Sequence, residues 1–475
     1  MMTAIPNLID GAVPPVAQTV AGILLSVAVW RSRHRCRVVV GATLAGATTI
    51  VVVQASIGTP VIPVTFSLWA VALGLAVLLA GGAWRSAAWA ARTLGVVTIT
   101  AACLATAVVV NSHYAYFPTV GDALHRPFAN RLALVKAVGA RTGPPPITER
   151  PAAGSRRDHQ GRLVRVHIPA TASGFRHRGE WVYLPPAWFE TPTPALPVIV
   201  LLPGTPGGTE DWIRAGGAVR VADRWAADHH GRSPILVFAD PNGSFRADTE
   251  CVDTSRARVD TYLSVDVPTY VRATFATAAG PSAWAVGGVS SGGTCAVTLA
   301  LRHPDVYRTF IDFSGEVAPN RGAKRDTMRL LFDGSSANAA RYDPTALLAL
   351  HTYSTTHAWF MAGSHDRPAR RAITHLAEAS RAAGVDTVSV ERPGGHTWRS
   401  WRRAFPEAFA WATTTIDPRG AAPSPVATSP LLTVPWPVVV SDVDGHGERR
   451  PPSASTNIQS AVARALRSRT TRRLR

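Results

Sequence analysis

The stretch Val286–Cys295 reads VGGVSSGGTC and places two adjacent serines between two pairs of glycines. Its middle, Gly288–Gly292, matches the pattern G-x-S-x-G, in which a nucleophilic serine occupies a strained turn between a strand and a helix. The apolar segment AWAVGGV precedes the match and GGTCAVTLALRHP follows it, as a strand and a helix would. The register selects Ser290, because Ser291 would need glycine where Val289 stands. A simple turn of small residues is the alternative interpretation.

A serine nucleophile needs a base, and one histidine stands where the chain order places it. His396 lies in the Gly-rich loop RPGGHTW, after the last strand-like segment and before a Trp-rich helix. In folds with this turn the order along the chain is Ser, acid, His, which nominates Asp366 in AGSHD as the acid that orients the imidazole. A solvated loop histidine and a helix N-cap, respectively, are the alternative roles of these two residues.

Two backbone N–H groups are expected to stabilise the oxyanion that forms when the serine attacks an ester. One belongs to Ser291, the residue after the nucleophile. The other should come from the loop after the first central strand, LLPGTPGGTEDW at Leu201–Trp212, where we select Thr205, with Gly204 allowing the turn. Such loops often contain His-Gly. Here the pair is Pro203-Gly204, a change that leaves backbone donors in place.

From about residue 161 to 415, apolar segments that end in turn residues alternate with helical patterns. LPVIVLLPG, PILVFAD, AWAVGGV and RTFIDFSG are clear examples, and THAWFMAGSHD and DTVSVERPGG continue the series. Runs of β-branched residues that alternate with helices predict a mostly parallel sheet covered by helices on both faces. The predicted fold class is therefore α/β, with an α/β-hydrolase fold over residues 161–415.

Three stretches together resemble the Putative esterase family of α/β-hydrolases: LLPGTPGGTEDW, GGVSSGGTCAVTLALRHPD and ERPGGHTWRSWRRAFPEAFAW. That family includes esterase D-like enzymes, siderophore-releasing esterases and secreted mycolyltransferases of actinobacteria. The resemblance covers roughly residues 161–415, and the Ser and His motifs are its specific parts. It implies an acyl-ester hydrolase or acyltransferase that works without a cofactor.

The first 111 residues differ from the rest of the chain. Four apolar stretches, at residues 15–30, 38–57, 64–84 and 94–110, each approach the ~20 residues that a membrane-spanning helix needs, and none contains an interior charge. We therefore predict a four-helix transmembrane anchor over residues 1–111, which resembles that of membrane-tethered actinobacterial members of the family. Buried helices of a soluble domain are one alternative. A cleaved signal peptide is another, disfavoured because no Lys or Arg precedes the first stretch.

Arg-rich loops set the predicted orientation of this anchor. RSRHRCR (31–37) follows the first stretch and RSAAWAAR (85–92) follows the third, whereas ASIGTPVIP (55–63) has no charge. Positive loops stay in the cytoplasm. The last span then delivers the chain to the outside, and the hydrolase domain is extracytoplasmic in a multi-pass protein of the cell membrane. Residues 112–160 have the composition of a linker, and the Pro- and Arg-rich tail 416–475 is expected to be disordered.

The 475 residues carry 49 basic and 31 acidic side chains, a net charge of +18. A nucleic-acid partner does not follow, because the arginines are spread over loops, helix faces and the tail and do not form one patch. The four cysteines have no metal-ligand spacing. Cys251 and Cys295 fall near strand ends on one side of the predicted sheet, so an oxidising compartment permits a disulfide between them. Two buried thiols are the alternative.

These observations favour a membrane-anchored, extracytoplasmic serine esterase that forms an acyl-enzyme on Ser290. Its substrates would be acyl esters, lipids or glycolipids, and it would use neither a metal nor a cofactor. Acyl transfer to an envelope sugar, as in a mycolyltransferase, is the alternative within the same chemistry. A catalytically silent hydrolase-fold module that binds or scaffolds envelope components is the alternative of another class. A four-span transporter is disfavoured, because no span contains an ionisable residue.

Overall fold

The computed structural model describes residues 7–9, 12–31, 40, 64–84, 88–123, 160–245 and 247–418. The chain divides into two compact units, Met1–Ala427 and Thr428–Arg475, and the second lies outside the described residues. Most of the predicted linker (124–159) and most of the predicted tail (419–475) also lie outside them.

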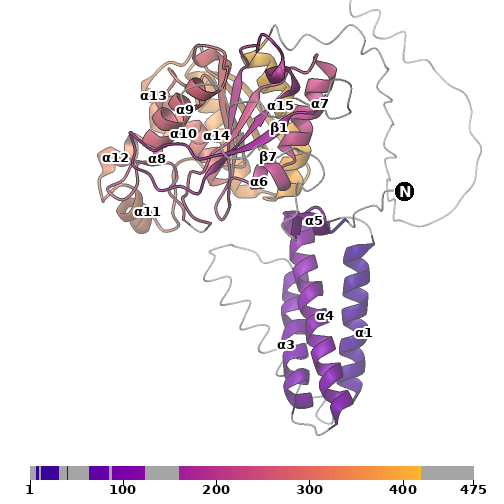
Figure 1. Ribbon diagram of the computed structural model, residues 1–475. Coiled ribbons are helices and arrows are strands. Elements are labelled where there is room, and N and C mark those ends of the chain that lie inside the picture. Colours follow the sequence, from indigo (N-terminus) through magenta and orange to yellow (C-terminus); the bar gives the residue numbers. More distant parts are fainter. Residues whose placement is uncertain are drawn as a thin grey trace, which may run out of the picture. The chain divides into compact units, whose positions relative to one another are not determined.

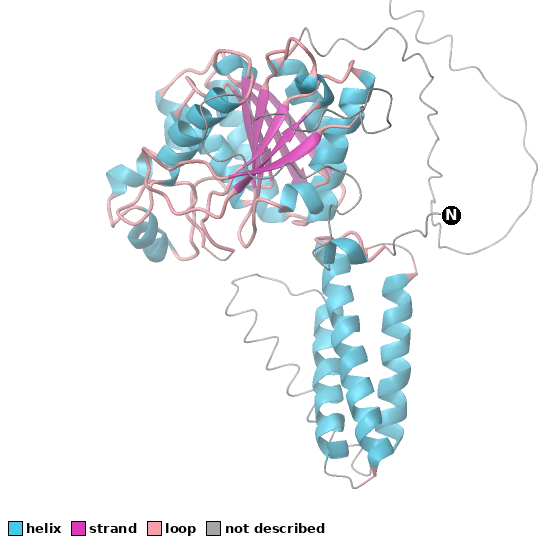
Figure 2. Cartoon of the chain, viewed as in Figure 1, coloured by secondary structure: helices cyan, strands magenta, loops and turns pink. Residues whose placement is uncertain are grey.

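Eight strands form one mixed, mostly parallel sheet in the order β1-β2-β4-β3-β5-β6-β7-β8 (Figure 2). The pairs β1–β2 and β2–β4 are antiparallel, and every other neighbouring pair is parallel. This is an α/β-hydrolase-like sheet, as predicted. The strands are β1 (Arg162–Val166), β2 (Glu180–Leu184), β3 (Val198–Leu202), β4 (Ile235–Phe238), β5 (Trp284–Val289), β6 (Thr309–Phe313), β7 (His357–Gly363) and β8 (Asp386–Arg392).

Helices cover both faces of the sheet (Figure 1). Side chains of β3 alternate between them, because successive residues of a strand point to opposite faces. Val198, Val200 and Leu202 belong to one buried cluster, and Ile199 and Leu201 belong to the other. The first cluster contains α8 (Val259–Thr261), α9 (Val267–Thr274), α10 (Ser291–Arg302), α13 (Pro344–Leu350) and α14 (Arg367–Ala382), and the second contains α6 (Asp211–Arg214), α7 (Ala218–Asp228) and α15 (Trp398–Ile416).

The remaining short elements of this domain lie in its connections. They are the 3₁₀ turns η2 (Pro186–Phe189) and η4 (Pro281–Ala283), the π-helical turn η3 (Tyr262–Asp266), α11 (Lys324–Leu331) and α12 (Ser336–Ala340).

The N-terminal region is helical, but the prediction of four membrane spans is not supported. Among the described residues, two helices are long and apolar enough to cross a membrane, α1 (Val13–Arg31) and α4 (Trp89–Tyr114). The helix α3 (Val64–Trp84) coincides with the third predicted stretch, but its apolar part among the described residues is the shorter segment Leu68–Ala80. The second predicted stretch lies outside the described residues apart from Val40.

The three N-terminal helices pack on one another through small and aliphatic side chains. Their shared buried cluster consists of Leu25, Ala28, Ala76, Leu79 and Ala102. The helix α4 extends past both ends of the predicted stretch 94–110, because helical backbone hydrogen bonding does not require apolar side chains and continues beyond the apolar run. A short helix, α5 (Val120–Ala123), follows it.

Candidate active site

Ser290 occupies the turn between β5 and α10, and its backbone has φ 55° and ψ −126°. A positive φ is rare for a residue with a side chain, and it persists where the surrounding structure enforces it. Two glycines supply that enforcement. A Cβ atom on Gly288 would collide with the backbone of Gly292, and one on Gly292 would collide with the carbonyl of Pro203. The two glycines of the motif are therefore required by close backbone packing, and they leave the serine at the apex of the turn.

Three predicted residues from distant parts of the chain lie in one hydrogen-bonded row. The Nε2 atom of His396 is 2.9 Å from the Oγ atom of Ser290, and its Nδ1 atom is 2.7 Å from the Oδ2 atom of Asp366. The carboxylate is buried, whereas 44% of the histidine side chain is exposed. With Nδ1–H donated to the carboxylate, Nε2 is free to accept the serine proton. The row can therefore activate a hydroxyl nucleophile at a surface that a substrate can reach.

Asp366 makes the contacts that both of its predicted roles require, one with His396 and one with the first turn of α14. Its Oδ1 atom accepts a hydrogen bond of 3.4 Å from the N–H of Ala369 in the first turn of α14, so it is also the N-cap of that helix. The cap uses one carboxylate oxygen and the histidine uses the other. Capping thus fixes the side chain in the orientation that the imidazole needs.

Thr205 and Ser291, the predicted oxyanion donors, lie together beside the nucleophile. The Ser291 hydroxyl donates to the Thr205 hydroxyl at 3.1 Å. Ser291 is the first residue of α10, where N–H groups have no acceptor within the helix. Gly204 packs so closely that an added Cβ atom would lie 3.1 Å from the Cβ atom of Ser290. Among the described residues, no hydrogen bond engages the backbone N–H of Thr205.

Cys251 and Cys295 form a disulfide with a Cα–Cα distance of 5.5 Å. Both residues are buried, and the bond joins the loop after β4 to the middle of α10. It fastens that loop to the helix whose first residue follows Ser290. Of the other two cysteines, Cys103 is a free thiol in α4, and Cys36 lies outside the described residues.

The structure adds neighbours that the sequence analysis did not select. The Trp401 ring meets the His396 ring edge to face, with centroids 5.0 Å apart, and its Nε1–H donates to the Ser314 hydroxyl at 3.1 Å. The Asn242 side chain donates to the Thr205 hydroxyl at 3.0 Å. The five-residue spacing of His396 and Trp401 at the start of a helix was a usable signal. Nothing local in the sequence pointed to Asn242.

A fully buried carboxyl, Asp312, lies in β6 beneath the first turn of α10. Its Oδ1 atom accepts a 2.7 Å hydrogen bond from the N–H of Gly315, and a Cβ atom added to Gly293 would collide with it. Among the described residues its Oδ2 atom has no partner. Burial raises the pKa of Asp312 to about 8, although the Gly315 hydrogen bond lowers it. The carboxyl is therefore largely protonated at neutral pH.

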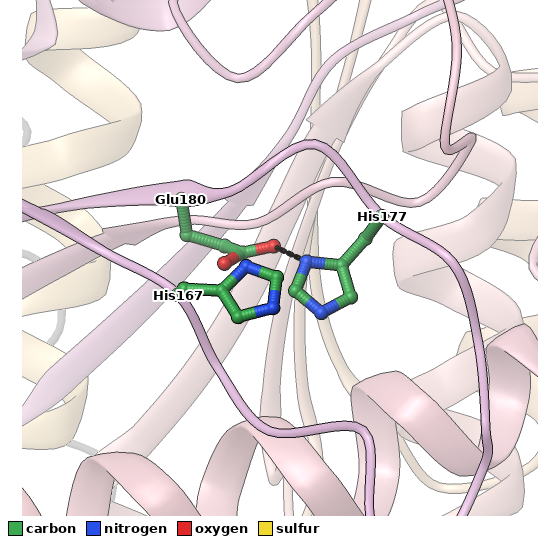
Figure 3. A group of neighbouring side chains, drawn as sticks. All are labelled: His167, His177 and Glu180. Atoms are coloured by element: carbon green, nitrogen blue, oxygen red, sulfur yellow. Dashed lines mark ion pairs between the residues drawn. The ribbon is translucent and has the colours of Figure 1, made fainter. Parts of the chain in front are cut away.

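His167, His177 and Glu180 place three possible ligand atoms within 4.8 Å of one another (Figure 3). The two imidazoles are stacked, with centroids 4.6 Å and planes 21° apart. Because imidazole lone pairs lie in the ring plane, two stacked rings cannot direct them at one ion. Glu180 is also engaged, since it accepts from the Tyr262 hydroxyl at 2.7 Å and the Ile168 N–H at 3.2 Å and lies 2.6 Å from His177 Nδ1. The group is a network of stacked rings, one close His177–Glu180 contact and hydrogen bonds to Glu180, and it does not fit a metal centre.

Comparison with known proteins gives a family and several similar chains. The model of the family described as "Putative esterase" matches residues 176–412. An uncharacterised protein of Corynebacterium glutamicum is 36% identical over 316 residues, which cover 64% of this chain and 72% of that protein.

Three solved structures are similar at lower identity. A ferulic acid esterase is 21% identical with a TM-score of 0.44, over 54% of this chain and 99% of that one. An S-formylglutathione hydrolase from Agrobacterium tumefaciens is 16% identical with a TM-score of 0.43, over 54% and 95% of the two chains. MPT51 of Mycobacterium tuberculosis is 20% identical with a TM-score of 0.37, over 52% and 97%.

Proposed function

Because this chain belongs to the Putative esterase family, we propose that it is a serine esterase that forms an acyl-enzyme on Ser290. The observation that carries the proposal is the pair of hydrogen bonds from His396, 2.9 Å to the serine Oγ atom and 2.7 Å to Asp366. A structural histidine has no need to present one nitrogen to a partly exposed hydroxyl while a buried carboxylate holds the other.

In the proposed reaction, His396 takes the proton of Ser290 as Oγ attacks the ester carbonyl. The N–H groups of Thr205 and Ser291 stabilise the oxyanion, and Asp366 stabilises the imidazolium. Collapse of the tetrahedral intermediate gives the proton to the leaving alcohol and leaves the acyl group on Oγ. Water, activated by the same imidazole, then releases the acid. Every proton moves through one ring nitrogen, so no cofactor enters the scheme.

We place this reaction outside the cytoplasmic membrane, with the apolar N-terminal helices as the anchor. Two observations support the location. The helices α1 and α4 are long and apolar enough to span a membrane, and the sequence puts Arg-rich loops on the side opposite the hydrolase domain. The Cys251–Cys295 disulfide is typical of an oxidising compartment. Protease added to intact spheroplasts should degrade the hydrolase domain and spare residues 31–37. Complete protection of that domain would contradict this orientation.

A fluorophosphonate probe, which reacts with activated serines, tests the chemistry directly. The full chain in detergent should be labelled, and peptide mapping should find the label on Ser290. The variant Ser290→Ala should lose labelling and ester turnover. The variant Ser291→Ala is the matched control: it keeps its backbone N–H and loses only the side-chain bond to Thr205, so it should retain most labelling. Labelling that persists in Ser290→Ala but disappears in Ser291→Ala would assign the nucleophile to the other serine.

Two alternatives are separated by further readouts. An acyltransferase would be labelled as well, but would pass its acyl group to a sugar in preference to water. Mass spectrometry of the adduct trapped on Ser290 from envelope extract identifies the acyl group, and product analysis with added sugar acceptors identifies the acceptor. A silent binding module would be labelled at neither serine and would hydrolyse no ester.

A further inference from the structure

Arg178 and Asp240 form a charged pair outside the row of Ser290, His396 and Asp366. Arg178 Nε donates to Asp240 Oδ2 at 2.9 Å, Nη2 donates to Oδ1 at 2.6 Å, and the Arg178 backbone N–H adds a third bond of 2.8 Å. The carboxylate is completely buried, and 30% of the arginine side chain is exposed. Burial opposes ionisation, but the hydrogen bonds and charge of Arg178 lower the pKa of Asp240 overall. The pair therefore stays charged at neutral pH.

The remaining guanidinium nitrogen reaches the loop after β3. Arg178 Nη1 donates to the Gly207 carbonyl at 2.9 Å, within the segment Pro203–Gly208, which we call the oxyanion loop because it contains Thr205. A guanidinium is planar and rigid. Its fork on Asp240 therefore fixes where the Gly207 carbonyl can lie.

Asp240 reaches the same loop by a second route. Its Oδ1 atom accepts hydrogen bonds of 3.1 Å from the N–H groups of Asn242 and Gly243, which shape the turn after β4. The Asn242 side chain then donates to the Thr205 hydroxyl at 3.0 Å. One buried carboxylate thus supports the oxyanion loop at both Thr205 and Gly207.

The side chains drawn in Figure 3 hold the backbone on either side of Arg178 in the sequence. His177 and Glu180 flank it in the sequence, and both are buried against the Tyr262 ring and hydroxyl. The backbone that carries Arg178 is therefore fixed before β2 begins. This gives the network of stacked rings a structural task, which is to hold the backbone that carries Arg178.

We propose that the Arg178–Asp240 pair positions the oxyanion loop so that the N–H of Thr205 faces the oxyanion formed at Ser290. The inference rests on the proposed function. Neither residue touches the reacting atoms. The pair acts through the loop, because oxyanion donors are effective when they are held in place before charge develops.

The test uses the full chain in detergent and the variant Arg178→Lys. Lysine keeps a positive charge beside Asp240, but one ammonium cannot reproduce the planar fork and also reach Gly207. With p-nitrophenyl butyrate, kcat should fall by about 10- to 100-fold, the size of loss that a small misplacement causes, while KM stays within about twofold. Hydrogen exchange of the Gly207 and Gly208 amides should become about tenfold faster or more, with exchange elsewhere in the sheet unchanged.

A second variant tests the proposal even if the lysine of Arg178→Lys forms enough of the same contacts to hold the loop. Arg178→Ala should show the same two effects, and guanidinium chloride at tens of millimolar should restore part of kcat, because the side chain is partly exposed. Arg329→Ala is the matched control, since Arg329 is an exposed arginine paired with Asp326 on α11. It should keep wild-type kcat and show no guanidinium response.

The outcomes separate the two proposals. Unchanged exchange of Gly207 and Gly208 in both Arg178 variants overturns the positioning role, whatever the activity. A rise in KM of about 10- to 100-fold with constant kcat also overturns the positioning role, because that result would mean that Arg178 contributes to substrate binding. A wild-type chain that neither hydrolyses the ester nor reacts with the fluorophosphonate overturns the proposed function, and the exchange data still decide whether Arg178 holds the loop.

Discussion

His396 and His177 each place Nδ1 beside a buried carboxylate, at 2.7 Å from Asp366 and 2.6 Å from Glu180. The two side chains differ in exposure and in the contacts of the rest of the ring. The His396 side chain is 44% exposed, and the His177 side chain is 2% exposed. The His396 Nε2 atom faces the Ser290 hydroxyl, whereas the His177 ring is stacked with those of His167 and Tyr262. A His–carboxylate pair supplies orientation and charge in both places, and access to the second nitrogen decides whether it can transfer a proton to a substrate.

The carboxylates differ in the same way. Asp366 accepts from one backbone N–H and from the imidazole, which leaves the ring free to exchange its proton on the other side. Glu180 is completely buried and accepts from Tyr262 and the N–H of Ile168 besides facing His177. Although burial opposes it, Glu180 raises the pKa of His177. The buried Glu180 carboxylate therefore favours the charged form of the His177 ring, whose side chain is almost completely buried.

The largest expected effect comes from removing the exposed histidine. His396→Ala should lower kcat for an ester by roughly 10⁴- to 10⁶-fold, as expected for a residue that acts as one unit with the nucleophile. The free energy of unfolding should change by less than about 1 kcal/mol, because nearly half of the His396 side chain is already exposed. Steady-state kinetics and thermal unfolding of the same preparation measure both. A loss of less than tenfold would contradict the proposed role of His396 as the base.

Asp366→Asn separates the acid role from the capping role. Asparagine is as good an N-cap as aspartate, so α14 should remain intact. The amide cannot stabilise the imidazolium or hold the same tautomer, and kcat should fall by about 10⁴-fold or less. Circular dichroism and kinetics together test this. Normal turnover with an intact helix would leave the cap as the whole function of Asp366.

The buried pair should show the reverse pattern. His177→Ala leaves the Glu180 charge without its partner, and the expected loss is about 3–5 kcal/mol of unfolding free energy. Activity per folded molecule should change far less than in His396→Ala. The raised pKa gives this contribution a sign: it is present below the unfolded histidine pKa of about 6.5 and is lost as pH rises through the folded value. Urea unfolding at several pH values measures it.

The control is His167→Ala, which removes an exposed ring from the stack and should cost about 1 kcal/mol or less. Equal losses in the two variants would show that the stack, and not the ion pair, stabilises this region.

Asp312 sharpens the comparison, because it is a buried carboxyl with no histidine. Its pKa of about 8, against an ordinary 3.8, means that the folded protein holds a proton between these pH values that the unfolded chain releases. Stability should therefore fall as pH rises through this window, by at most about 1.4 kcal/mol per unit. Asp312→Asn cannot titrate, so its unfolding free energy relative to wild type should rise from pH 5 to pH 8. Parallel curves would contradict the assignment.

Local patterns were sufficient to predict the sheet and its turn. Segments such as LPVIVLLPG and AWAVGGV were predicted as buried strands and became β3 and β5. The register of G-x-S-x-G depends on three positions that are close in sequence. Gly288 and Gly292 pack so closely in the turn that a side chain on Gly288 would collide with the backbone of Gly292, which is why the motif requires glycine there. His396 and Asp366 were found because chain order narrows the choice to the loops after β7 and β8.

Contacts across long separations were not predictable in this way. Arg178 and Asp240 are 62 residues apart, and Tyr262 meets Glu180 across 82. Neither pair has a local signature, since strand order decides which loops become neighbours. Asp312 was not selected, because nothing in the strand-like segment RTFIDFSG shows that its carboxyl will be buried against Gly293 of α10. Of the four predicted membrane spans, two are matched among the described residues by helices long and apolar enough to cross a membrane, and the second predicted stretch lies almost wholly outside those residues.

The disulfide also has a mechanical consequence. Cys251 and Cys295 are 44 residues apart, and the ring of chain that they close contains α9, β5 and Ser290. When the ends of this domain are pulled apart, tension passes through the sulfur–sulfur bond and bypasses the ring. An extended chain spans about 3.5 Å per residue, so the disulfide prevents roughly 150 Å of chain from being extended when the domain unfolds under force. In the oxidised protein, the pulling force is therefore not transmitted along the chain of the turn that carries Ser290, even after the strands outside the ring have unfolded.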